Sequence, residues 1–99
     1  MPLPPQPAVC ILASRRNATL YIGSTTDLSR RVWEHREKLT PGFTSEYDVT
    51  MLVWYQHYDR VIDARHREYK IKKWRREWKM KLIAEMNPEW RDFYEDLNK

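Results

Sequence analysis

The chain has 99 residues, of which 32% are charged, and a formal net charge of +4. This length predicts one domain with a single modest core, and no apolar run is long enough to cross a bilayer. The single cysteine, Cys10, excludes an internal disulfide and is typical of a reducing compartment, so we expect a cytoplasmic protein that does not bind membranes. No Cys/His cluster has the spacing of a zinc site, which argues against a structural zinc.

Hydrophobic patterns and turn residues divide the chain into a short arm and one domain. Residues 1–7 hold four of the six prolines and predict an exposed arm, and residues 8–97 form the predicted domain. In chain order its predicted elements are strands at 8–13 and 19–23, a helix at 27–39, a strand at 51–57 and helices at about 61–74, 75–87 and 90–97. The order β-β-α-β-α-α-α predicts an α+β fold, a small three-stranded antiparallel sheet covered by helices.

The boundaries of the helices follow from particular residues. Thr26 or Asp27 caps the first helix, whose apolar stripe is Leu28, Val32 and Leu39. This helix is expected to end at Thr40, Pro41 and Gly42, and the long helical region after Val61 is expected to break near Trp74 and Arg75 and to stop at Asn87 and Pro88. We expect Trp54, Trp74, Trp78 and Trp90 to lie in the core, because a small basic domain needs large apolar side chains.

The first candidate site combines the second strand with the helix that follows it. Arg31 and His35 lie four residues apart and therefore share one helix face, just beyond the strand that carries Tyr21. A fixed cation, a group that can carry a proton and a phenol suit work on a phosphodiester. The alternative for His35 is a boundary imidazole that packs near Leu39.

Glu68 is the second candidate. It shares one helix face with Val61, Ala64 and Ile71, where the pattern requires an apolar residue. A buried carboxylate is costly unless it meets a cation, and Mg²⁺ needs few protein carboxylates because it keeps several waters. The alternatives are an ion pair with Lys72 or with Arg31. In the metal-site interpretation we expect Glu68 and Arg31 to point into one concavity at the open side of the sheet.

Nine cations are concentrated between residues 65 and 81, interleaved with aromatic residues. They are Arg65, Arg67, Lys70, Lys72, Lys73, Arg75, Arg76, Lys79 and Lys81. Such a stretch is typical of nucleic-acid binding, for which Lys72, Lys73, Arg75 and Arg76 are the candidates. It is equally typical of a solvated helix with paired charges four residues apart.

Taken together, these residues resemble the GIY-YIG endonuclease superfamily, in particular its short single-domain bacterial members, which are similar to the N-terminal catalytic module of the excinuclease incision subunit. The resemblance covers residues 8–97. The sequence Tyr21-Ile22-Gly23 resembles the second name motif, and Asp27-Leu28-Ser29-Arg30-Arg31 resembles the segment that carries the family's catalytic arginine. His35 and Glu68 match the family's His or Tyr and its metal-binding glutamate.

The resemblance implies a mechanism. A tyrosine in the sheet helps to deprotonate a water, Arg31 stabilises the charge on the phosphate, and Glu68 holds one Mg²⁺ or Mn²⁺ ion. The first name motif aligns with Ala8-Val9-Cys10, so its tyrosine is Cys10 here. Tyr21 or His35 then takes over as proton acceptor, or the nuclease is weak, or cleavage is lost and a binding surface remains.

We therefore expect a divalent-metal-dependent endonuclease that acts on DNA, with repair or recombination as its setting. A small domain has little surface for reading bases, so we expect selection of DNA shape rather than sequence, with or without a protein partner that supplies specificity. The alternative is a catalytically impaired GIY-YIG-like module that binds structured nucleic acid without cutting. A basic adaptor for an acidic protein would require Arg31 and Glu68 to be coincidental.

Overall fold

The computed structural model describes residues 6–39, 42 and 46–97. Its elements are β1 (Ala8–Ala13), β2 (Leu20–Thr25), α1 (Leu28–Arg36), β3 (Met51–His57), α3 (Val61–Lys72), α4 (Arg76–Met86) and α5 (Tyr94–Leu97). The strands form one antiparallel sheet in the order β2-β1-β3. This architecture confirms the predicted α+β class and element order. Residues 1–5 of the predicted arm, and Thr40 and Pro41, lie outside the described residues.

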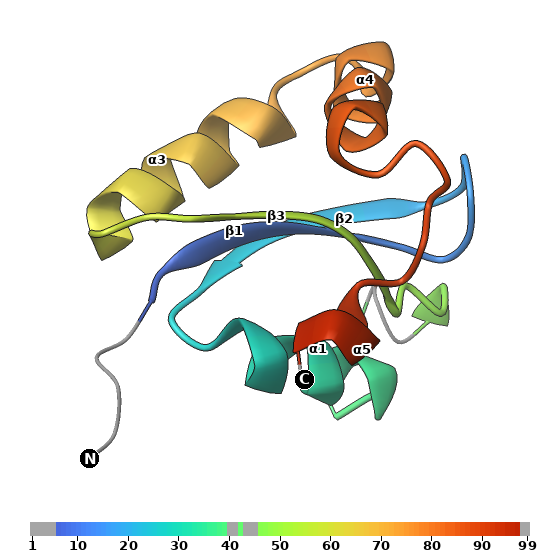
Figure 1. Ribbon diagram of the computed structural model, residues 1–99, viewed down its shortest axis with the longest axis horizontal. Helices are drawn as coiled ribbons and strands as arrows, with labels where there is room; N and C mark the ends of the chain where they lie inside the picture. Colours follow the sequence, from blue (N-terminus) through green and yellow to red (C-terminus); the bar gives the residue numbers. More distant parts are fainter. Residues whose placement is uncertain (1–5, 40–41, 43–45, 98–99) are drawn as a thin grey trace.

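Helices cover both faces of the sheet. In Figure 1, α3 and α4 lie on one face and α1 and α5 lie on the other. The central strand β1 is buried along its whole length because it is covered from both sides. Val9 and Ile11 pack toward α3 and α4, whereas Cys10 and Leu12 pack toward α1. The continuous apolar sequence of this strand follows from its position.

The edge strand β2 is joined to β1 by a tight turn that α4 holds in place. Asn17 adopts a positive φ of 57° in this turn, and the Ser14 amide donates a hydrogen bond to the Thr19 carbonyl at 3.1 Å. Arg76 at the start of α4 donates to the carbonyls of Asn17, at 2.9 Å, and of Ala18, at 2.5 Å. The Arg76 guanidinium therefore links α4 to the turn between β1 and β2.

The first helix ends earlier than the sequence predicts. Lys38 adopts a positive φ of 56°, its amide donates to the His35 carbonyl at 3.1 Å, and the Leu39 amide donates to the Glu34 carbonyl at 2.9 Å. This pair of bonds is a Schellman termination, here without glycine. It turns the chain away from the core, so that Leu39 is 59% exposed and the predicted third member of the apolar stripe is wrong. Leu28 and Val32 are buried as predicted.

The C-terminal elements agree with the sequence in the break after α3 and in the end of α4, but the last helix, predicted at 90–97, begins only at Tyr94. The break between α3 and α4 falls at residues 73–75, and α4 ends at Met86 just before Asn87 and Pro88, as predicted. Trp54 and Trp90 are buried and Trp74 packs against the core, but Trp78 is 52% exposed, so its prediction as a core residue is wrong. Among the described residues, no helix is long and apolar enough to span a membrane.

Candidate active site

The candidate site is organised around the end of β2. Tyr21 and Gly23 are two residues apart and therefore point to the same face of the sheet, toward α1. A Cβ atom added at Gly23 would lie 2.9 Å from Cε1 of Tyr21 and 3.1 Å from its hydroxyl oxygen. The Tyr21 ring therefore lies along β2 over Gly23. Only glycine at position 23 leaves room for the ring there, which gives the Tyr-Ile-Gly motif a physical reason.

Ser24, the next residue of β2, contacts Glu68 of α3. The Ser24 hydroxyl donates a hydrogen bond to Glu68 Oε1 at 2.5 Å, and Lys72 Nζ lies 2.6 Å from Glu68 Oε2. Burial alone would raise the pKa of the Glu68 carboxyl, but the bonds from Lys72 and Ser24 and the charge of Arg65 outweigh it and hold the pKa below its usual value. Glu68 is therefore a carboxylate at neutral pH, and the predicted alternative of an ion pair with Lys72 is present.

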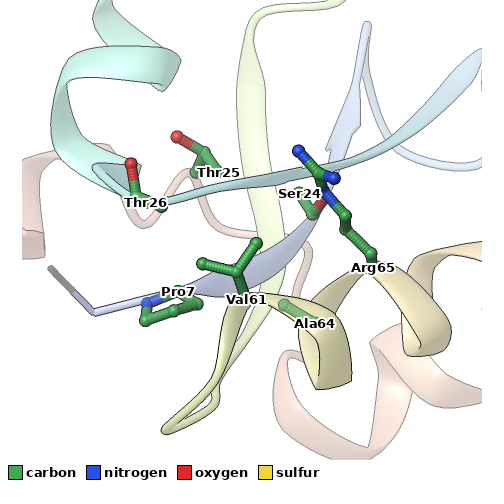
Figure 2. A pocket seen from close by; sticks show the side chains of 7 residues that line it. All are labelled: Pro7, Ser24, Thr25, Thr26, Val61, Ala64 and Arg65. Carbon is green, nitrogen blue, oxygen red and sulfur yellow. The ribbon is translucent and has the colours of Figure 1, made fainter.

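A pocket of about 250 Å³ opens beside this carboxylate, between the end of β2 and the first turns of α3. Figure 2 shows its lining residues, with the guanidinium of Arg65 beside Ser24. The lining consists of Pro7, Ser24, Thr25, Thr26, Val61, Ala64 and Arg65. Ser24 and Thr25 are not among the site residues expected from the sequence. The run of hydroxyl residues before the helix cap was the available signal, and its position between a candidate strand and a candidate helix could have indicated it.

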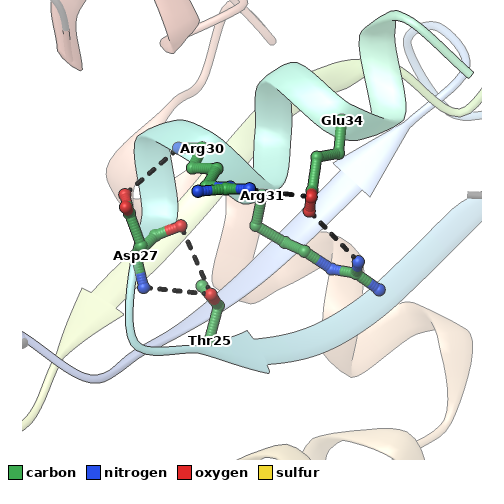
Figure 3. A network of polar contacts seen from close by, with 5 residues as sticks. All are labelled: Thr25, Asp27, Arg30, Arg31 and Glu34. Atoms are coloured by element: carbon green, nitrogen blue, oxygen red, sulfur yellow. Dashed lines mark hydrogen bonds and ion pairs between the residues drawn. The ribbon is translucent and has the colours of Figure 1, made fainter. Parts of the chain in front are cut away.

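Arg31 reaches the same strand from α1. The Asp27 carboxylate caps this helix by accepting from the Arg30 amide at 3.2 Å, and the Thr25 hydroxyl accepts from the Asp27 amide at 3.0 Å (Figure 3). The Arg31 guanidinium is hydrogen-bonded to the Tyr21 phenol and lies 3.4 Å from Glu34 Oε1. Burial opposes its charge, but these bonds outweigh burial and raise the pKa of Arg31 further, so the charge is permanent.

His35 lies one helical turn after Arg31 and packs against the same tyrosine. Its ring centroid is 5.1 Å from that of Tyr21, with the rings tilted by 54°, and the side chain is only 1% exposed. Burial, and then the charge of Arg31, lower the pKa of His35 below its ordinary 6.5. The imidazole is therefore neutral at neutral pH. Arg31 and His35 share one helix face as the spacing predicts, and both contact Tyr21.

Cys10 lies directly opposite Gly23 in the ladder between β1 and β2 and is buried. Burial raises the pKa of its thiol to about 12, and the charges of Arg31 and Glu68 both act on it. The thiol therefore keeps its proton at neutral pH. The charges of Arg31 and Glu68 come from α1 and α3, which cover opposite faces of the sheet.

The expected single concavity for Arg31 and Glu68 stays a prediction, and the two residues reach β2 from different helices. The two residues come from α1 and α3, which cover opposite faces of the sheet (Figure 1). They meet β2 at consecutive positions, because Tyr21 brings Arg31 to Gly23 on one face and Ser24 holds Glu68 on the other. Since β2 is an edge strand, the two charged groups are arranged around that edge rather than across an enclosed cleft.

A divalent ion at this site would have few protein ligands. Within residues 6–39, 42 and 46–97, no group of three or more His, Cys, Asp or Glu side chains is placed to hold a metal. Glu68 nevertheless fits a hard cation, because its carboxylate already holds the ammonium of Lys72 and hydroxyl oxygen from Ser24 is adjacent. Mg²⁺ and Mn²⁺ prefer oxygen ligands, and Mg²⁺ usually keeps several waters, so one carboxylate is sufficient to anchor such an ion.

The four cations predicted to bind nucleic acid do not share one location. Lys72 pairs with Glu68, and Arg76 holds the turn between β1 and β2. The Lys73 ammonium donates to the Tyr69 hydroxyl at 2.5 Å, and Arg75 lies 3.6 Å from Glu77. Each cation thus has a partner within the protein, and contact with phosphates stays a prediction for all four.

The sequence of this chain is similar to those of known proteins. The model of the GIY-YIG catalytic domain matches residues 6–82. The UPF0213 protein SSP2268 of Staphylococcus saprophyticus is 31% identical over 70 residues, which cover 71% of this chain and 85% of that protein. The UPF0213 protein HQ_3675A of Haloquadratum walsbyi is 37% identical over 67 residues, which cover 68% of this chain and 75% of that protein.

A solved structure shares the fold. It is the solution NMR structure of the UPF0213 protein BH0048 from Bacillus halodurans, with a TM-score of 0.55 and 24% identity, covering 88% of this chain and 92% of that one. This likeness supports the architecture, and the family match extends from the residues just before β1 into α4. The chain belongs to the GIY-YIG catalytic-domain family.

Proposed function

We propose that this protein is a divalent-metal-dependent endonuclease that hydrolyses phosphodiester bonds in DNA during repair or recombination. The observation that supports this most strongly is the meeting of three groups at the edge of β2. The permanent cation of Arg31 and the phenol of Tyr21 lie on one face, and the carboxylate of Glu68 lies on the other. A phosphodiester bound at this edge would contact all three.

In this proposal Arg31 stabilises the negative charge that builds on the phosphate, because a positioned cation in a partly dehydrated site is an effective electrostatic catalyst. The Tyr21 phenol positions the attacking water by a hydrogen bond, and the proton of that water passes to solvent. His35 is too deeply buried to reach a water at the edge, so we assign it a positioning role: its ring holds that of Tyr21 over Gly23.

Glu68 would hold the divalent ion in place of the Lys72 ammonium. A bound Mg²⁺ or Mn²⁺ ion supplies positive charge to the phosphate and to the leaving oxygen. Ser24 orients the carboxylate through its short hydrogen bond. Lys72, which pairs with Glu68 in the absence of the ion, would then be available to a phosphate.

The pocket beside Glu68 suits an adjoining phosphate of the same strand. Arg65 and the hydroxyl groups of Thr25 and Thr26 line it, and these groups donate hydrogen bonds to phosphate oxygens without reading the bases. This composition supports selection by DNA shape rather than by sequence.

A second candidate function is a module that binds structured nucleic acid without cutting it. It is favoured by Cys10, which occupies the position of the first motif tyrosine. A buried thiol with a pKa of about 12 cannot take a proton from water at neutral pH, and its side chain is too short to reach the edge of β2. Any cleavage then depends on Tyr21 as the remaining motif tyrosine.

The two functions are separated by a cleavage assay on branched, flapped and plain duplex DNA with Mg²⁺, with Mn²⁺ or with EDTA. We expect cleavage only with a divalent ion and loss of cleavage in Glu68→Gln. The matched control is Glu77→Gln, which removes an exposed carboxylate that pairs with Arg75. Binding to the same DNA without cleavage under any metal condition would favour the non-cutting module, and cleavage that persists in EDTA would refute the metal requirement.

A further inference from the structure

An exposed groove between α3 and α4 combines aromatic rings with cations. It has a volume of about 420 Å³ and is lined by Arg67, Trp74, Trp78, Lys81, Leu82 and Glu85. We call it the α3–α4 groove. Its most exposed ring, Trp78, is one that the sequence analysis placed in the core, so its exposure requires another explanation.

The rings of the groove form an ordered platform. Trp74 and Trp78 make an edge-to-face contact with centroids 6.2 Å apart and an interplanar angle of 79°. The Arg67 guanidinium carbon lies 5.1 Å from the Trp74 centroid, and that of Arg75 lies 5.7 Å from the Trp78 centroid. The two aromatic side chains are thus held by each other and by flanking cations, although half of Trp78 faces solvent.

Arg67 adds a second, independent observation. Its Nε atom is buried and has no hydrogen-bond partner among the described residues. A buried donor without an acceptor is costly in a folded protein. If Arg67 turned toward the groove when a ligand bound, an acceptor oxygen such as that of a phosphate would satisfy this donor.

We propose that the α3–α4 groove binds unpaired nucleotides of a nucleic acid. The base of one nucleotide stacks on Trp78, and the neighbouring phosphates of the strand contact Arg67, Arg75 and Lys81. Aromatic stacking platforms within a basic groove are the general solution for single strands, because every base offers a π face. Glu85 is a hydrogen-bond acceptor in the lining, which suits the amino edge of a base and not a phosphate.

The groove is separate from the candidate active site. Arg67 and Glu68 are consecutive on α3, and their side chains leave the helix about 100° apart. They flank the buried strip formed by Ala64 and Ile71, so Glu68 faces β2 while Arg67 faces the groove. A substrate with a duplex at the edge of β2 and an unpaired segment around α3 would contact both. The inference therefore rests on the proposed nucleic-acid substrate, and it narrows that substrate to DNA with an unpaired segment.

The test measures binding by fluorescence anisotropy in EDTA, so that cleavage plays no part in it. The probes are a labelled oligothymidylate, an abasic chain of the same length and a blunt duplex. We expect Trp78→Ala to weaken oligothymidylate binding about tenfold, because stacking on one ring is lost, and to leave the abasic chain and the duplex unaffected. Trp78→Phe keeps a stacking ring and should retain most of the affinity.

The matched control is Trp33→Ala, because Trp33 is also exposed but lies on α1, on the other face of the sheet. We expect the Trp33→Ala variant to bind oligothymidylate with the same affinity as the parent protein. Lys81→Gln should lower the salt dependence of binding by about one released counterion, whereas Trp78→Ala should not change it.

Three results would overturn the inference. An equal loss on the abasic chain would show that no base is bound, and an equal loss in Trp33→Ala would show that the effect is not specific to the groove. A change of oligomeric state in Trp78→Ala with unchanged DNA binding would assign the groove to a second copy of the chain. If the parent protein does not cleave DNA but its binding of oligothymidylate still depends on Trp78, the proposed nuclease function is refuted. The proposal that the groove binds unpaired nucleotides then still holds.

Discussion

The two faces of the sheet differ in what they bury. Toward α3 and α4 the core consists of apolar side chains such as Ile11, Ile71 and Ile83, with the amide of Asn87 at its edge, where it donates to a backbone carbonyl. Toward α1 the buried layer includes the thiol of Cys10, the imidazole of His35 and the partly buried ring of Tyr21. Polar groups in a core cost stability, and they are tolerated where chemistry requires them. The comparison indicates that the α3 and α4 face contributes mainly stability and the α1 face contributes mainly the site.

Glu68 shows how the two faces cooperate. It belongs to α3, but it lies at the rim of the apolar face and contacts β2 through Ser24. The site therefore does not require a cleft within one layer. An edge strand with a glycine at the point of contact allows groups from both faces to approach one another.

The largest expected effect on stability is on the α3 and α4 face. Ile71→Ala removes a fully buried side chain from this core and should lower the free energy of unfolding by about 2–5 kcal/mol. Urea unfolding monitored by circular dichroism measures this change. A loss no greater than that of the exposed variant Ile62→Ala would contradict the division of roles between the faces.

The largest expected effect on activity is on the α1 face. Arg31→Ala should reduce the cleavage rate by about 10²–10³-fold, because it removes the charge positioned for the phosphate, and should change the melting temperature little. The matched control is Arg30→Ala, which removes the neighbouring arginine that pairs with Glu34 at 3.8 Å and is largely exposed. Single-turnover cleavage compares the two. Equal losses would mean that only the general charge of α1 matters.

Cys10→Tyr tests a position where packing and chemistry compete. We expect the ring to overpack the buried site opposite Gly23 and to lower the free energy of unfolding by about 1–3 kcal/mol, while Tyr21 keeps the cleavage rate unchanged. Cys10→Val, which is close to it in volume, should be neutral in both respects. A large gain of cleavage at an unchanged melting temperature would show that the missing phenol limits this enzyme.

The smallest expected effect concerns pH. The pKa of His35 in the folded protein lies below the ordinary value of 6.5, so the unfolded chain binds more protons near that pH. The stability that neutral His35 contributes is fully present above about pH 6.5 and is lost as the pH falls through the folded pKa. Thermal unfolding between about pH 7 and pH 5 should therefore show a smaller decline in His35→Gln than in the parent. An identical decline in both proteins would remove His35 as its source.

Local patterns were sufficient to predict the strands, the order of strands and helices along the chain, and the break between α3 and α4. The apolar sequence of β1 and the turn residues 73–75 act over short distances, so they can be recognised without the fold. The convergence of Tyr21, Arg31 and His35 also followed from helix spacing and the strand before it.

The remaining features depend on tertiary arrangement. Leu39 is exposed because Lys38 adopts the left-handed conformation that ends α1, and no glycine marks that position. Trp78 is exposed because α4 turns Ile83, and not Trp78, toward the sheet. Helix periodicity showed that Glu68 lies near a buried strip, but it could not show which face of the sheet α3 would cover. That face decides whether Glu68 and Arg31 share a concavity.

The central claim is that Arg31 and Glu68 act on one phosphodiester from opposite faces of the sheet. The most direct test measures single-turnover cleavage for Arg31→Ala, Glu68→Gln and the double variant at a saturating divalent-ion concentration. Groups that act as a unit are strongly non-additive, so the double variant should cleave about as slowly as the slower single variant. Losses that multiply in the double variant would mean that the two residues act independently and would contradict the account.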